Sequence, residues 1–152
     1  MTVIRHQVQA RCAPDRIWSL LADLEAVAHY NPGVVAAKIQ GDKRTGIGAV
    51  RVCELLPKGR VVERVTHWED GRALGLEVAE SDWPIHFMRW VTRVEPKDDG
   101  SRITQELEYR VKFGPIGWLL DRLAMERKLR TSLDGIFESL VKHAEGTSEG
   151  AG

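Results

Sequence analysis

The sequence has only two cysteines and lacks any long apolar segment. Cys12 and Cys53 lie far apart and show no CxxC or Cys/His spacing, so neither a zinc site nor a disulfide framework is supported. We interpret both as reduced, half-buried strand residues. No segment approaches the roughly 18 uninterrupted apolar residues that a transmembrane helix requires. We therefore expect a cytoplasmic protein with no integral membrane segment.

An excess of charge of either sign is also absent. The 22 Lys and Arg residues balance the 22 Asp and Glu residues, so no overall field attracts nucleic acid or an anionic membrane. No nucleic-acid partner is expected. The sequence also contains no nucleophile triad, phosphate-binding loop or cofactor fingerprint, so we expect no cofactor. With 152 residues, 43% of them hydrophobic, the chain can bury the core of one domain.

The C-terminal third of the sequence predicts one long helix, from Gly114 to Ala144. It would be roughly 40 Å long, more than twice the usual length in globular proteins. Its apolar positions keep a helical spacing but drift around the axis, as expected for a helix that crosses a twisted sheet. The last eight residues, 145–152, contain only Gly, Ser, Thr, Glu and Ala and predict a disordered tail. Residues 1–144 would form the domain.

The rest of the chain predicts mainly strands. Thr2 to Arg11 alternates apolar and polar residues, and Pro14 to Leu24 and Ala26 to Tyr30 predict two short helices. Period-two patterns then predict six further strands, at 34–39, 49–56, 60–69, 73–80, 86–95 and 102–113. The turns between them are short, so neighbouring strands should form antiparallel hairpins. The expected fold is α+β, with a seven-stranded antiparallel curved sheet wrapped around the long helix. The space between the sheet and the helix is where we expect a function.

This order of elements resembles the helix-grip fold of the START and birch-pollen-allergen superfamily, SRPBCC, over nearly the whole chain. Ala13 to Asp23 is similar to the opening motif of its bacterial polyketide cyclase/dehydrase-like branch, and Tyr30 to Val34 matches its aromatic-x-Pro-Gly-Val turn. Gly46 to Arg51, Val62 to Val65 and Glu69 to Leu74 resemble its middle strands. The superfamily includes lipid and hormone binders, aromatases, cyclases and quinone-binding proteins, so the resemblance implies a fold more firmly than a function.

Strand alternation and this resemblance together predict which side chains face the cavity. The resemblance implies that Glu63 points inward and Arg64 outward. On the last two strands, alternation turns Met88, Trp90, Gln105 and the apolar residues after Gln105 inward. The complete predicted ligand-binding set is His6, Glu63, Val65, Met88, Trp90, Gln105, Leu107, Tyr109 and Leu123. An apolar wall with few polar groups suits a hydrophobic small molecule that carries one or two oxygens.

Each of these side chains also has a purely structural interpretation. A register slip of one residue would place Glu63 in solvent, and an inward Glu63 would need a partner, a raised pKa or nearby water. His6 fits a packed or rim position better than a catalytic one. Met88 and Trp90 are compatible with either a plain core or a ligand contact. A metal site formed by His6, His67 and Glu63 has no supporting motif, so we expect no metal.

Two loops are expected at the entrance of the cavity. Pro57, Lys58 and Gly59 form one, and the segment from Ser81 to Ile85 forms the other. In related hormone receptors, loops at these positions act as gate and latch. Trp83, followed by Pro84, could pack onto its own hairpin, cap the cavity or meet a partner. The long helix carries a run of charged residues that is typical of a solvated face. These residues are Arg122, Glu126, Arg127, Lys128 and Arg130. A basic stripe for acidic lipid headgroups is the alternative.

Three functions remain open at this point. The first is a binding or carrier protein for a hydrophobic small molecule such as a lipid, isoprenoid, quinone or polyketide. The second is an enzyme of the polyketide cyclase, aromatase or dehydratase type, with Glu63 as acid or base and Gln105 or Tyr109 orienting a carbonyl oxygen. The third is an interaction module in which the Trp83 loop or the basic helix face makes a weak contact with a protein or membrane. The pattern indicates no particular oligomeric state.

Overall fold

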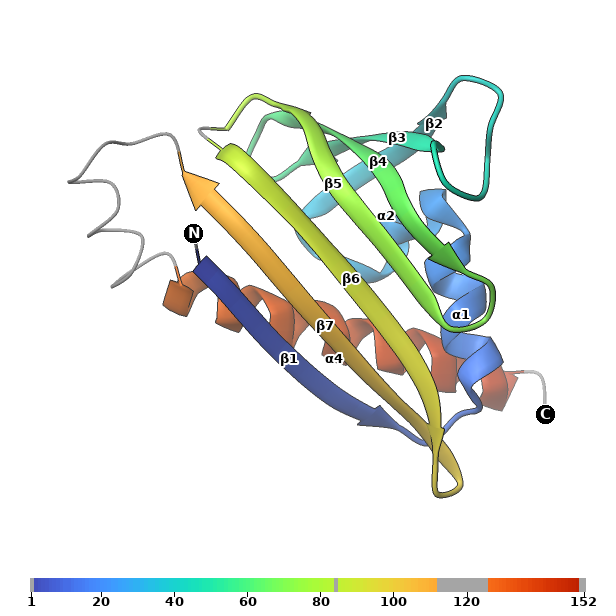
Figure 1. Ribbon diagram of the computed structural model, residues 1–152. Coiled ribbons are helices and arrows are strands. Elements are labelled where there is room, and N and C mark those ends of the chain that lie inside the picture. The colour runs from blue at the N-terminus through green and yellow to red at the C-terminus, as the bar shows by residue number, and fades with distance from the viewer. Residues whose placement is uncertain (1, 84, 112–125, 151–152) are drawn as a thin grey trace.

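The computed structural model describes residues 2–83, 85–111 and 126–150. It contains a seven-stranded antiparallel sheet in the order β1-β7-β6-β5-β4-β3-β2, with helices on one face (Figure 1). The strands are β1 (Thr2–Ala10), β2 (Val34–Gln40), β3 (Val50–Leu55), β4 (Arg60–Glu69), β5 (Ala73–Ser81), β6 (Ile85–Lys97) and β7 (Gly100–Val111). The helices are α1 (Pro14–Ala22), the 3-10 turn η1 (Leu24–Ala26), α2 (Val27–Tyr30) and α4 (Glu126–Gly150). The predicted helix-grip architecture is confirmed.

The first strand, β1, lies at one edge of the sheet, next to the last strand. Residues Thr2 to Ala10 pair antiparallel with β7 from Tyr109 back to Ser101. Every other neighbouring pair is a sequential hairpin, as the short turns predict. The turn between β4 and β5 places Gly71 at a φ of +76°, a conformation that glycine adopts without the steric strain that other residues incur.

Helix α4 packs across the concave face of the sheet. It runs behind the strands in Figure 1 and contacts β1, α1 and α2. Its buried positions Leu133, Phe137, Leu140 and Ala144 recur every three or four residues, so they form one stripe along the helix. On the sheet, the apolar side chains that alternate inward, including Ile4, complete the core.

The C-terminal boundary differs from the sequence prediction. Helix α4 continues past Ala144 to Gly150, into the segment that composition predicted to be disordered. Ala144 is fully buried, and a carboxylate oxygen of Glu145 accepts a hydrogen bond from the backbone N–H of Arg11 at 3.2 Å. These tertiary contacts lie at the start of a segment whose composition alone does not favour order. The predicted start of this helix at Gly114 lies outside the described residues.

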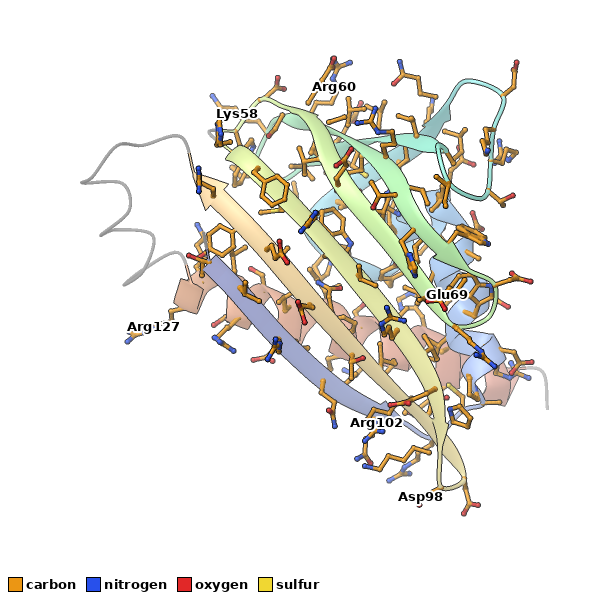
Figure 2. The ribbon with its side chains drawn as sticks, viewed as in Figure 1. Lys58, Arg60, Glu69, Asp98, Arg102 and Arg127 are labelled. Atoms are coloured by element: carbon orange, nitrogen blue, oxygen red, sulfur yellow. The ribbon has the colours of Figure 1, made fainter. Side chains whose placement is uncertain are left out.

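The outer face of the sheet is polar and carries cross-strand ion pairs. Arg64 of β4 contacts Glu77 of β5 at 2.6 Å, and Arg89 of β6 contacts Glu108 of β7 at 2.9 Å. Such exposed pairs contribute little stability individually, about 0 to 1 kcal/mol. They nevertheless show which side of each strand faces water. On α4, Arg127, Lys128 and Arg130 are exposed, and Arg127 projects from one end of the helix in Figure 2, as expected of a solvated face.

No helix within the described residues is both long and apolar enough to cross a membrane.

Candidate ligand-binding cavity

A cavity of about 210 Å³ lies between α4 and the concave face of the sheet. Most of its wall is apolar, with contributions from the sheet, from the short helices and from one side of α4. Its described lining comprises Leu21, Val27, Tyr30, Asn31, Val34, Arg51, Glu63, Leu74, Leu76, Met88, Trp90, Thr92, Gln105, Leu107, Leu129, Ser132, Leu133, Ile136, Phe137 and Leu140. Concave apolar sites with a few polar groups are the usual form of small-molecule sites.

One part of the wall is formed by a buried ion pair. Arg51 of β3 and Glu63 of β4 are direct partners in the antiparallel register. Arg51 Nε donates a hydrogen bond to Glu63 Oε1 at 2.7 Å, and Arg51 Nη1 donates to the backbone carbonyl of Leu24 at 3.1 Å. The two side chains are only 5% and 11% exposed. Glu63 therefore faces inward, on the side predicted, and its partner is Arg51.

Arg51 keeps its charge in the interior because the carboxylate of Glu63 lies beside it. Burial alone would lower the pKa of Arg51, but the carboxylate of Glu63 raises it above its ordinary value, so the guanidinium stays charged. Tyr30 of α2 lies beside Arg51, and burial raises the pKa of its phenol. The hydroxyl of Tyr30 is therefore neutral at physiological pH. This polar end of the cavity, comprising Tyr30, Asn31, Arg51 and Glu63, contains one cation, one anion and two neutral groups.

A second polar position lies on the sheet. Thr92 of β6 and Gln105 of β7 are direct partners in the register, and Thr92 Oγ1 donates to Gln105 Oε1 at 2.9 Å. Ser132 of α4 also belongs to the cavity wall. The carbonyl oxygen of Gln105 is thus already engaged, and its amide N–H groups remain as donors. The apolar side chains of the wall include Leu76 and Trp90, which are cross-strand partners.

The structure brings five of the predicted ligand-binding residues together in the cavity wall. These are Glu63, Met88, Trp90, Gln105 and Leu107. Val65 and Tyr109 face inward but belong to the packed core, at 1% exposure each, and neither is among the lining residues described. A ligand-binding role for these two residues stays a prediction, because alternation identifies the inward face of a strand but not where the interior is hollow. Leu123 lies outside the described residues.

His6 is half-buried and is not among the described lining of the cavity. Its ring stacks on Phe137 of α4, with centroids 5.1 Å apart, and its Nε2 lies 3.4 Å from a carboxylate oxygen of Asp134. Phe137 itself lines the cavity, so His6 packs against a residue of the cavity wall. His67 is bound to Glu69 at 2.7 Å near the end of β4. Among the described residues, no three His, Cys, Asp or Glu side chains gather as metal ligands do.

Arg51 is the site residue that the sequence analysis missed. It appeared only as the end of a motif, although a hairpin symmetric about Pro57 pairs it with Glu63. An inward carboxylate on β4 requires a partner, and the facing residue on β3 is the nearest candidate. The hairpin register was therefore the signal that could have identified this pair.

Comparison with known proteins agrees with this architecture. A model of the family described as polyketide cyclase/dehydrase and lipid transport matches residues 1–145. The chain belongs to this family. Membership in this part of the SRPBCC superfamily implies binding of a hydrophobic ligand or a cyclase function. No curated protein matches the sequence.

Solved structures share the fold at low sequence identity. A protein from Thermus thermophilus is 18% identical with a TM-score of 0.81, covering 97% of this chain and 99% of the other. A START superfamily protein from Mycobacterium smegmatis is 16% identical with a TM-score of 0.77, covering 95% and 98%. Norcoclaurine synthase from Thalictrum flavum, solved in complex with dopamine and hydroxybenzaldehyde, is 18% identical with a TM-score of 0.70, covering 95% and 87%. At these identities the likeness shows the fold alone.

The two loops predicted as gate and latch contact each other in this family member. The indole Nε1 of Trp83 donates to the backbone carbonyl of Lys58 at 3.1 Å, so Trp83 packs on the neighbouring β3–β4 turn rather than on its own hairpin. Lys58 lies at the end of the sheet opposite Asp98, as Figure 2 shows. The described wall of the cavity does not include Pro57, Lys58, Gly59 or Trp83. Pro84 lies outside the described residues. A gating role for these loops stays a prediction.

Replacing Gly59 by Ala should loosen this contact between the loops. Gly59 has a φ of +108°, and a Cβ atom there would overlap the indole ring of Trp83. We expect Gly59→Ala to lower the free energy of unfolding by roughly 2 kcal/mol or more, from backbone strain and displacement of the indole. Gly41→Ala is the matched control, because Gly41 has a φ of +90° and open space around it. Its loss should be about 1 kcal/mol. Equal losses in urea titrations of both variants would show that the indole contact contributes nothing.

Cys53 provides a prediction about pH. Burial, followed by the charge of Glu63 whose Oε1 lies 3.8 Å from its Sγ, raises the pKa of the Cys53 thiol from 9.0 to about 12. A raised pKa means that the folded state favours the neutral thiol, so the associated stability is complete below pH 9 and is lost as the pH rises toward 12. Between these limits the wild type should lose up to about 1.4 kcal/mol per pH unit more than Cys53→Ala. Parallel pH profiles of unfolding free energy for the two proteins would contradict this account.

Proposed function

We propose that this protein is a binding or carrier protein for a hydrophobic small molecule, such as a lipid, isoprenoid, quinone or polyketide, held between α4 and the sheet. The observation that carries the proposal is the cavity itself, whose wall, in the part of the chain that the structure describes, is apolar apart from the Arg51–Glu63 ion pair and a few hydroxyl and amide groups. An apolar ligand gains free energy there by leaving water, at about 25 cal/mol per Å² buried. The family's lipid-transport description supports the same interpretation.

A carrier function is favoured over catalysis by how the polar groups are already engaged. Glu63 Oε1 accepts from Arg51, and Gln105 Oε1 accepts from Thr92. The guanidinium of Arg51 therefore occupies one of the two carboxylate oxygens that a catalytic acid or base would use. Tyr109, the third candidate catalytic group, belongs to the packed core.

Native mass spectrometry of the freshly purified protein tests the proposal. We expect a fraction of the protein to carry one apolar molecule, seen as a mass increment that disappears under denaturing conditions. The same protein should take up a neutral apolar fluorescent probe, N-phenyl-1-naphthylamine, with a single saturating site. Repeated preparations without an increment, together with no saturable uptake of the probe, would contradict a carrier function.

A cyclase or dehydratase is the second candidate, and one observation favours it. Glu63 and Gln105 line the same cavity, so a bound carbonyl compound could contact a carboxylate and an amide together. The co-purified molecule distinguishes the two functions. A carrier returns it with unchanged mass after prolonged incubation, whereas an enzyme converts it, and Glu63→Gln then lowers turnover by about 100-fold or more.

A further inference from the structure

The carboxylate of Glu63 has one oxygen engaged and one that is not. Oε1 accepts from Arg51 and lies near the thiol of Cys53. Among the described residues, none donates a hydrogen bond to Oε2. Glu63 forms part of the cavity wall and keeps a small accessible fraction of 11%. A buried carboxylate with a vacant oxygen is a strong acceptor, and hydrogen bonds to charged groups exceed those between neutral ones.

The described residues around this oxygen carry no net charge. Arg51 and Glu63 neutralise each other, and Arg51 also donates to the carbonyl of Leu24. No other charged residue is among the described lining of the cavity. A ligand that brings a carboxylate would therefore make the buried site negative beside Glu63, which is unfavourable both through repulsion and through desolvation. A neutral ligand leaves the balance unchanged.

Two polar residues of the wall, Tyr30 and Asn31, also favour a ligand that carries a hydroxyl group. The hydroxyl of Tyr30 lies beside Arg51, and Asn31 also lines the cavity. The Oδ1 of Asn31 accepts from the backbone N–H of Gly33 at 2.9 Å, so its amide N–H groups remain as donors. A ligand hydroxyl could donate to Glu63 while accepting from one of these neighbours. An ether or ester oxygen could only accept, and Glu63 Oε2 would then face it without a donor, which costs free energy in a buried place.

We propose that the cavity selects uncharged amphipathic molecules whose polar end carries a hydroxyl or another hydrogen-bond donor, and that it discriminates against ligands ending in a carboxylate. Glu63 Oε2 receives the donor, and the apolar wall receives the hydrocarbon part. The ligand class is thus long-chain or cyclic alcohols and phenols rather than fatty acids. This inference rests on the proposed carrier function and adds to it the chemistry of the polar end.

The test compares three ligands with similar straight hydrocarbon chains, 1-decanol, 1-methoxydecane and decanoate. Each displaces N-phenyl-1-naphthylamine from the wild-type protein at neutral pH. We expect 1-decanol to bind about tenfold more tightly than 1-methoxydecane, because only the alcohol donates to Glu63, and decanoate to bind most weakly. Equal affinities of alcohol and ether, or tighter binding of decanoate, would overturn the proposal. A wild-type protein that takes up neither probe nor alcohol would instead overturn the carrier function itself.

Two variants separate the role of Glu63 from a general preference of apolar cavities for neutral molecules. Glu63→Gln leaves the charge of Arg51 without its carboxylate, so the affinity ratio of decanoate to 1-decanol should rise by about tenfold or more. Glu77→Gln is the matched control, because Glu77 pairs with Arg64 on the outer face and its loss changes the net charge equally. A ratio that stays constant in Glu63→Gln, or rises as much in Glu77→Gln, would overturn the proposal.

Should Glu63→Gln not fold, the double variant Arg51→Gln with Glu63→Gln decides the matter. It removes both charges together, so no buried charge is left without a partner. Its preference for 1-decanol over 1-methoxydecane should fall to nearly equal affinity. An undiminished preference in the double variant would show that another group recognises the hydroxyl, and the assignment to Glu63 would be wrong.

Discussion

Replacing Arg51 by Met is expected to lower the free energy of unfolding by about 3–5 kcal/mol. The substitution keeps an unbranched chain of similar length but removes the donor to Glu63 Oε1 and the donor to the carbonyl of Leu24. Glu63 would then be a buried carboxylate without a counter-charge, which must either stay ionised at a large desolvation cost or take up a proton. Urea titration followed by tryptophan fluorescence measures the loss.

Arg64→Met is the matched control on the adjacent position of the same strand. Arg64 pairs with Glu77 at 2.6 Å, but its side chain is 51% exposed, so its loss should cost less than about 1 kcal/mol. The double variant Arg51→Met with Glu63→Leu should recover much of the stability, since no charge is then left in the interior. Similar losses for Arg51→Met and Arg64→Met would contradict the view that the inner pair is buried.

Replacing Leu107 by Trp should abolish uptake of N-phenyl-1-naphthylamine, with a loss of affinity of roughly 100-fold or more, while the circular dichroism spectrum stays native. Leu107 lies on β7 between Ile4 of β1 and Trp90 of β6, is 4% exposed and lines the cavity. The indole would occupy the space that the ligand needs, and a densely packed interior does not yield that volume easily. The overpacking itself should cost about 1–3 kcal/mol of stability.

Leu56→Trp provides the same change of side chain at an exposed position. Leu56 is 55% exposed and is not among the described residues of the cavity wall, so probe affinity should stay at the wild-type value. Unchanged affinity in Leu107→Trp would place the binding site elsewhere on the protein.

Local signals explain why the fold could be predicted from the sequence. Strand β4 has the predicted bounds, Arg60 to Glu69, because alternation and the flanking turns act over a few residues. Strand β6 extends to Lys97, beyond the predicted end at Glu95, since Pro96 is accommodated where the hairpin with β7 is about to turn. Helix α4 runs past the predicted boundary at Ala144, where Glu145 contacts Arg11, a residue that is distant in sequence.

The candidate site was harder to predict from the sequence than the fold, because it depends on contacts between residues that are distant in the sequence. Alternation and family resemblance placed Glu63 inward, but its partner Arg51 follows only from the hairpin register. The contact of His6 with Phe137 brings together the two ends of the chain. The sequence left three roles open for Trp83, and its hydrogen bond to the carbonyl of Lys58 on the neighbouring turn was not among them. No local pattern specifies any of these contacts.

Methyl NMR of the protein with bound 1-decanol tests the central claim most directly. If the ligand occupies the cavity between α4 and the sheet, intermolecular nuclear Overhauser effects should connect its chain to the methyl groups of Met88, Leu107 and Leu129, which line that cavity. The exposed methyl groups of Val35 and Leu56 should show none. Contacts confined to the exposed methyl groups, with none to Met88, Leu107 or Leu129, would contradict the account.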